Sequence, residues 1–129
     1  LIREVEKKAQ EMGVKAVVAV SDAAGRPVAI ECMDGAYIGS FDVALNKTFT
    51  SVAFQMSTAE LGKLASPGGS LYGIQNTNDG KIVIFGGGEP LYVDDVLIGA
   101  IGVSGGTAEQ DTALGAYGKN IAKEVISWK

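Results

Sequence analysis

The sequence contains no histidine. This absence excludes Ser-His-Asp and Cys-His catalysis, histidine-ligated zinc, and the side chain best suited to proton transfer near neutral pH. The one cysteine, Cys32, has no partner for an internal disulfide. A chain of this kind favours a reducing compartment, so we expect a cytoplasmic protein. We expect no metal site.

Basic clusters and long apolar runs are also missing. The 11 Lys and Arg residues against 15 Asp and Glu give a net charge of -4, which argues against nucleic acid or an anionic membrane as partner. Apolar stretches such as residues 16–20 are too short to cross a bilayer. No signal peptide is visible, and because the chain opens at Leu1 and not at Met, residues before Leu1 in the native chain remain an open question. The length of 129 residues and the 47% hydrophobic content fit one globular domain over residues 1–129.

Hydrophobic periodicity predicts an α+β fold in which a central, mainly antiparallel, five-stranded sheet is flanked by helices. The strands are joined by tight turns, which favours antiparallel neighbours. Ser40 is a candidate helix cap, and Ser57–Glu60 and Thr107–Gln110 have the pattern of capping boxes. The final helix has an apolar face that extends to Trp128. The predicted strands are 14–20, 27–33, 81–85, 91–93 and 96–103, and the predicted helices are 2–12, one from residue 40, one from 57 to about 66, and one after 107.

The helix that follows Ser40 has two unusual sides. One side is mainly apolar, and the opposite side mixes apolar and polar groups where a solvent-facing side should be mostly charged. We expect this mixed side to be covered by another subunit or by a ligand, and therefore predict an even-numbered homo-oligomer. The apolar side consists of Phe41, Leu45, Thr48, Phe49 and Val52, and the mixed side of Val43, Lys47, Thr50 and Phe54.

Lys47 is the best single candidate for chemistry. In a partly buried position its ammonium group is suited to a ligand carboxylate or phosphate, to Asp34 or Glu31, or to a salt bridge at a subunit contact. A catalytic role would use Lys47 with Asp34 or Glu109. Cys32 and Met33 lie in a predicted strand and are expected to be packed core.

Two glycine-rich turns complete the candidate site. The backbone N–H groups of residues 86–88 are suited to an anion, although simple turn geometry explains the same glycines. Residues 104–107 precede a helix, so unpaired N–H groups and the positive end of its dipole lie there, and acids in its first turn are explained by helix stability alone. The expected ligand-binding residues are Lys47, Thr50, Gly86, Gly87, Gly88, Ser104, Gly105 and Gly106.

A series of motifs resembles the GlcG/HbpS-like family, the domain that also forms the C-terminal part of PduO-type corrinoid adenosyltransferases. The series runs through residues 33–36, 44–50, 86–91 and 98–111, of which 98–111 is the most specific, and the resemblance covers nearly the whole chain. It implies a profilin-like sandwich, and assemblies from dimers up to rings or octamers. Members occur beside glycolate, propanediol and glycerol utilisation genes, and some bind haem or sense haem or redox state. The adenosyltransferase activity of PduO belongs to a separate N-terminal domain.

Three functions follow as hypotheses. The first is an oligomeric accessory protein that binds a small anionic or cofactor-like ligand, linked to small-alcohol or glycolate metabolism or to haem or corrinoid handling. The second is a lyase, isomerase or hydrolase that uses Lys47 with a carboxylate, and the third is a non-catalytic assembly scaffold. The resemblance makes haem and corrinoid the cofactor candidates, but a sequence without histidine excludes His-ligated haem. We expect only weak adsorption of haem, because Cys32 and Met33 should be buried.

Overall fold

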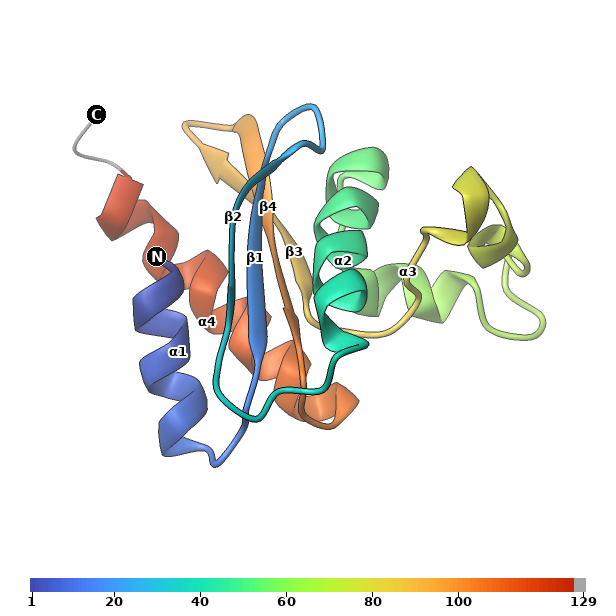
Figure 1. The fold of residues 1–129 in the computed structure, drawn as a ribbon. Coiled ribbons are helices and arrows are strands. Elements are labelled where there is room, and N and C mark those ends of the chain that lie inside the picture. Colours follow the sequence, from blue (N-terminus) through green and yellow to red (C-terminus); the bar gives the residue numbers. More distant parts are fainter. Residues whose placement is uncertain (127–129) are drawn as a thin grey trace.

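The computed structural model describes residues 1–126, and its centre is a four-stranded sheet with the strand order β2-β1-β4-β3. Helices α1 and α4 cover one face of this sheet and α2 covers the other (Figure 1). The strands are β1 (Val17–Asp22), β2 (Pro27–Cys32), β3 (Gly88–Val93) and β4 (Val96–Ser104), and the helices are α1 (Ile2–Glu11), α2 (Ser40–Phe54), α3 (Thr58–Leu64) and α4 (Ala108–Ile126).

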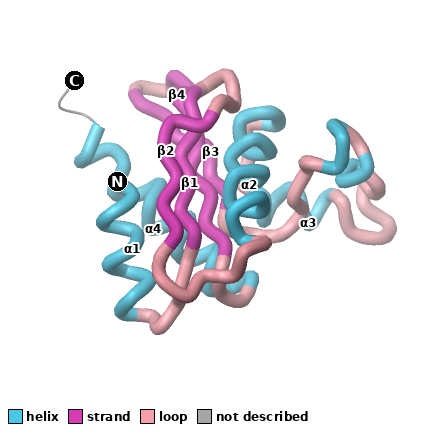
Figure 2. Tube along the Cα trace, in the orientation of Figure 1, coloured by secondary structure: helices cyan, strands magenta, loops and turns pink. Residues whose placement is uncertain are grey.

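Every neighbouring pair of strands in the sheet is antiparallel, as the tight turns predicted. In the turn after β1, Asp22 Oδ1 accepts hydrogen bonds from the backbone N–H groups of Ala24 at 2.9 Å and Arg26 at 3.0 Å. Asp94 and Asp95 join β3 to β4 with φ angles of 50° and 64°, the left-handed conformation that a two-residue hairpin turn requires. Figure 2 shows the four strands as one layer, with α1 and α4 on one side and α2 on the other.

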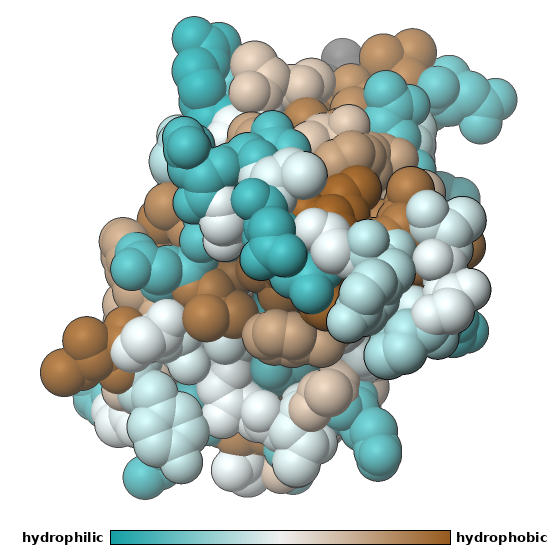
Figure 3. All heavy atoms as spheres, turned by 90° about the vertical axis from the view of Figure 1, so that its right-hand side faces the viewer, coloured by the Kyte–Doolittle hydropathy of each residue, from teal (hydrophilic) through white to brown (hydrophobic). Residues whose placement is uncertain are grey.

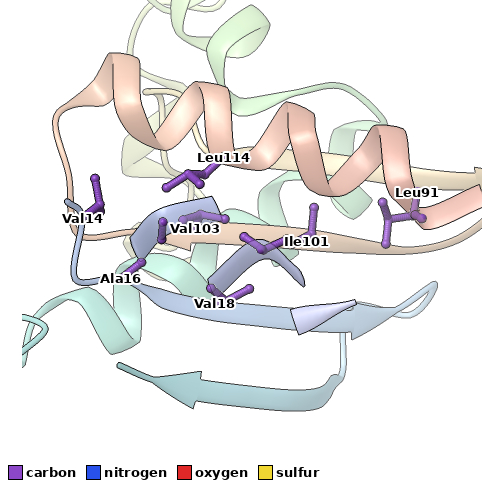
Figure 4. Packing of buried hydrophobic residues seen from close by; sticks show 10 residues of the cluster. Val14, Ala16, Val18, Leu91, Ile101, Val103 and Leu114 are labelled. Carbon is purple, nitrogen blue, oxygen red and sulfur yellow. The ribbon is translucent and has the colours of Figure 1, made fainter. Parts of the chain in front are cut away.

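The main hydrophobic core lies between the sheet and the α1–α4 layer. Val18 of β1 and Ile101 and Val103 of β4 point toward Leu114 of α4 (Figure 4). All four side chains are fully buried, and burial of such side chains stabilises the fold by roughly 1.5–3 kcal/mol each. This core holds α1 and α4 against one face of the sheet.

On the opposite face of the sheet, α2 packs differently from what its sequence pattern predicts. Two residues of the mixed side of α2 are covered by their own chain: Lys47 and Thr50 are fully buried without another subunit or a ligand, while Val43 and Phe54 are half-buried. Small residues on α2 allow this close approach, and a Cβ atom at Gly102 of β4 would collide with the carbonyl oxygen of Ala44. The apolar side is divided, because Thr48 is also fully buried whereas Phe41 is 42% exposed. Brown, apolar side chains accordingly gather on the face seen in Figure 3.

The predicted strand at residues 81–85 does not form, so the sheet has four strands and not five. The Thr50 hydroxyl of α2 accepts a hydrogen bond from Val83 N at 3.0 Å and lies 3.4 Å from Lys81 O. A side chain thus occupies backbone groups that a neighbouring strand would need. The chain reaches this segment from α3 through two short 3-10 helices, η1 (Ile74–Asn76) and η2 (Asn78–Gly80).

Two of the three predicted helix caps make capping hydrogen bonds. Ser57 Oγ accepts from Glu60 N at 3.1 Å, and Thr107 Oγ1 accepts from Gln110 N at 3.1 Å while Gln110 Oε1 accepts from Thr107 N at 2.9 Å. Ser40 makes no capping hydrogen bond, because the cap of α2 is Gly39. Trp128, expected on the apolar face of α4, lies outside the described residues. Among residues 1–126, no helix combines the length and the apolar composition needed to cross a membrane.

Candidate functional site

Lys47 lies in a closed polar cluster between α2, β4 and α4. Its Nζ atom donates hydrogen bonds to Val103 O at 2.6 Å and to Asp111 Oδ2 at 3.3 Å. The side chains of Lys47 and Asp111 are 0% and 4% exposed. Burial lowers the pKa of Lys47, and the charge of Asp111 opposes that shift. The ammonium group is therefore held by its own chain and is sealed from solvent.

The glycine loop before β3 passes beside this ammonium group. Gly87 has a φ of 128°, and a Cβ atom there would lie 2.6 Å from Lys47 Nζ, so no larger residue fits. Gly88 N donates to Thr58 Oγ1 at 2.9 Å, and Val103 N donates to Gly87 O at 3.0 Å. The loop contributes close packing here, and its hydrogen bonds are made within the protein.

The carboxylate beside Lys47 is Asp111, and neither Asp34 nor Glu109 takes part. Among the described residues, Lys47 forms its ion pair with Asp111. Asp34 lies on the wall of a separate surface hollow, and Glu109 is exposed in the first turn of α4. The catalytic pairing considered from the sequence therefore has no geometric support in this chain.

A basal hollow of about 680 Å³ opens between α1, the start of β1 and the end of β2. Its size falls within the range of roughly 300–1,000 Å³ that is common for small-molecule sites. Three cations line its wall, and Glu6 and Asp34 are its two acids. The pKa of Glu6 is raised by burial and by the neighbouring carboxyl group of Glu31. The lining residues are Arg3, Glu6, Lys7, Gln10, Gly13, Val14, Lys15, Cys32, Met33 and Asp34.

Cys32 is exposed on the wall of the basal hollow, which corrects the expectation that it is packed core. It lies at the end of β2, an edge strand whose residues are mostly exposed. Met33 is half-buried, and its Sδ atom accepts a hydrogen bond from Ala16 N at 3.4 Å. The thiol is therefore accessible from the hollow, whereas the thioether is partly engaged in packing.

A smaller side hollow of about 260 Å³ adjoins the basal hollow across Gly13, Val14 and Lys15, which line both. Gly105 and Gly106 form part of its wall. These two glycines are the members of the predicted ligand-binding set that reach an open surface. Ser104 is buried, as are Lys47, Thr50 and the three glycines at 86–88.

Sequence reasoning missed Arg3, Lys7 and Lys15. A signal was present, because Arg3, Lys7 and Gln10 recur at helical spacing on the polar side of α1. The position of this side beside the end of β2 depends on how the helix packs, which the local pattern does not specify.

A third hollow, of about 640 Å³, lies at the opposite end of the sheet. The Asp94–Asp95 turn and the cations Lys119 and Lys123 line it. Nearby, Lys119 Nζ lies 3.6 Å from Glu89 Oε1, and burial raises the pKa of Glu89 while Lys119 acts in the other direction. Its charges are mixed and it has no thiol, so it offers fewer groups for a cofactor than the basal hollow.

The fold and the site define an α+β sandwich domain, in which one antiparallel sheet lies between helical layers and an open basic hollow lies at the sheet's end. Residues 1–119 match the family described as "Haem degrading protein HbpS-like", and the chain belongs to this HbpS-like family. The family resemblance inferred from the sequence is thereby confirmed.

Curated relatives and solved structures agree with this assignment. The chain is 45% identical to an uncharacterized 15.0 kDa protein of the dhaT-dhaS intergenic region of Citrobacter freundii, over 88% of this chain and 80% of that protein. It is 40% identical to the corrinoid adenosyltransferase PduO of Salmonella typhimurium over 86% of this chain, but it spans only 33% of PduO. A PduOC:heme complex superposes with a TM-score of 0.89 at 37% identity, covering 92% of this chain and 86% of the other. HbpS of Streptomyces reticuli, as a double mutant, gives 0.83 at 26% identity, covering 92% and 79%.

The family description and the PduOC:heme complex both name haem. The basal hollow has side chains whose chemistry suits haem. A cysteine thiolate is a known axial ligand of haem iron. Arginine and lysine pair with carboxylates such as the haem propionates. Val14 and Met33 add apolar wall, and the exposed thiol of Cys32 stands among the three cations. The residues of this hollow therefore fit haem without histidine.

Proposed function

We propose that this protein is an accessory protein of haem or corrinoid handling that binds a carboxylate-bearing tetrapyrrole in the basal hollow. The observation that carries the proposal is the grouping of one exposed thiol with three cations in a hollow of about 680 Å³. Membership of the HbpS-like family and the similarity to a PduOC:heme complex supply the ligand class.

Each side chain has a distinct task in this proposal. Cys32 would supply the axial sulfur ligand, while Arg3, Lys7 and Lys15 would hold the carboxylates at the rim. Val14 and Met33 would contact the apolar macrocycle. When bound, haem would supply redox-active iron, and the protein groups around it would set its ligation and its access to solvent.

This proposal replaces the expectation of weak haem adsorption, which assumed that Cys32 is buried. The accessible thiol removes that assumption. The proposal also keeps the homo-oligomer, because the accessible apolar side of α2 and Ile38, 96% exposed, offer a surface for a second copy. The cytoplasmic location stays a prediction from the single cysteine.

The enzyme hypothesis has less support. Lys47 is fully buried and paired, so a substrate has no access to its amine in the single chain. An assembly scaffold remains the rival outcome of the test, because a scaffold does not need a ligand in the basal hollow.

Titration with haemin, followed through the Soret band, tests the proposal. We expect a saturating transition at one haem per subunit in the wild-type protein, with an absorption spectrum typical of thiolate ligation. Cys32→Ser keeps the size of the side chain and removes the thiolate, so the spectrum should change and the affinity should fall.

The matched control is Ser70→Ala, because Ser70 is exposed in the segment after α3 and does not line the hollow. This variant should bind haemin as the wild type does. Linear, non-saturating adsorption in the wild type, or a Cys32→Ser variant that is indistinguishable from it, would reject the proposed site and favour the scaffold.

A further inference from the structure

Asp111 connects the closed polar cluster to the open hollows. Its Oδ2 atom accepts a hydrogen bond from Lys47 Nζ at 3.3 Å, and its Oδ1 atom accepts one from Gly106 N at 2.9 Å. Gly106 lines the side hollow that adjoins the basal hollow. One carboxylate therefore holds a buried ammonium group with one oxygen and a wall of the hollow with the other.

The Gly105–Gly106 turn, which forms part of the wall of the side hollow, packs closely against the backbone of Lys15 and Ala16. Gly105 has a φ of 149°, and a Cβ atom there would collide with the backbone of Lys15 and lie 2.9 Å from Ala16 Cα. Lys15 itself lines both hollows. A displacement of the Gly105–Gly106 turn would therefore shift the backbone that carries Lys15.

Stability alone does not account for a buried ion pair at this position. Desolvation of two charges is so costly that well-packed apolar residues of similar volume often stabilise a fold equally well or better. An apolar replacement would, however, leave the Gly106 N–H without its acceptor. Beyond packing, the ion pair holds Asp111 Oδ1 in the direction of the Gly106 N–H group.

We propose that Lys47 and Asp111 form a positioning pair: Lys47 orients the Asp111 carboxylate, Asp111 fixes the Gly105–Gly106 turn, and the turn sets the affinity of the adjoining hollows for ligand. Neither side chain lines the basal hollow or the side hollow, so the pair acts without touching a ligand bound there. This inference rests on the proposed function for the link to binding, but the effect on the turn is independent of any ligand.

Two double variants separate positioning from packing. Lys47→Met with Asp111→Leu removes both charges and the acceptor while it keeps similar volume. Lys47→Met with Asp111→Asn also removes both charges, but the asparagine Oδ1 still accepts from Gly106 N. The measurements are the exchange rate of the Gly106 amide by NMR and the affinity for haemin.

In the Met/Leu variant we expect the Gly106 amide to exchange faster and the haemin affinity to fall by about tenfold, the scale of one lost hydrogen bond. The Met/Asn variant should stay within about threefold of the wild type in both readouts. If the Met/Leu variant does not fold, Lys47→Met with Asp111→Ala removes the acceptor without crowding the cluster and takes its place.

Equal Gly106 exchange in the folded variants with and without the acceptor would overturn the positioning role. Faster exchange with unchanged haemin affinity would overturn the link between the turn and the hollow. A wild-type protein that does not bind haemin would reject the proposed function instead, and the exchange rates would still decide whether the pair fixes the turn.

Discussion

The closed cluster around Lys47 and the basal hollow around Lys15 are built from similar parts but differ in access to solvent. Each contains a lysine, a glycine-rich turn and an acidic side chain close by. Lys47 is sealed and paired with Asp111, whereas Lys15 is exposed. Residue type and spacing therefore identify a candidate lysine. Packing decides whether its charge stabilises the fold or is available to a ligand.

The largest expected effect comes from breaking the closed cluster. Lys47→Ala leaves the Asp111 carboxylate buried without its cation, which should lower the free energy of unfolding by about 3–5 kcal/mol. Urea denaturation followed by circular dichroism measures this change. Lys15→Ala is the control, and it should stay within about 0.5 kcal/mol because Lys15 is exposed. Equal losses in the two variants would remove the distinction between the two lysines.

The second prediction removes the charge of the basal hollow. The triple variant Arg3→Gln, Lys7→Gln and Lys15→Gln should weaken haemin binding by about tenfold, since exposed ion pairs contribute roughly 0.2–1 kcal/mol each. Its Tm should stay near the wild-type value. Lys119→Gln with Lys123→Gln neutralises the hollow at the other end of the sheet and serves as control. Equal weakening in both variants would indicate a general charge effect.

The smallest expected effect concerns Glu89, whose side chain is 13% exposed and whose pKa is raised by this burial. Between the ordinary carboxyl pKa and the raised value, the folded state binds more protons than the unfolded state, so stability falls as pH rises through this window. Glu89→Gln should therefore raise Tm at pH 7 by about 1–2 °C, with the difference fading as pH falls below the ordinary carboxyl value. A lower Tm for the variant at pH 7 would show that the Lys119 ion pair outweighs the cost of burial.

Much of the fold was predictable, because periodicity and turn signals are local. The β1–β2 and β3–β4 hairpins and the two capping boxes needed only residues close in sequence. The segment 82–84 has the β-branched composition of a strand. Its backbone partner is the Thr50 hydroxyl more than thirty positions earlier, a tertiary contact that composition does not reveal.

A second subunit or a ligand was expected to cover Lys47 and Thr50 of α2, whereas the same chain buries them. The reason is again a tertiary contact. The small and polar residues of α2 face a sheet surface that contains Gly88 and Gly102, where only small groups fit. Apolar periodicity favours large side chains as the inward face, so it does not detect packing based on close approach. The pairing of Lys47 with Asp111 joins residues 64 positions apart, and their spacing in the sequence carries no sign of it.

NMR with equimolar ferric haem distinguishes binding of ligand in the basal hollow from binding in the closed cluster. Paramagnetic iron broadens the amide signals closest to it. We predict that Val14, Lys15 and Cys32 lose intensity first, while Lys47 and Gly87 in the closed cluster keep theirs. Selective loss at Lys47 and Gly87, with Val14, Lys15 and Cys32 unchanged, would contradict binding in the basal hollow.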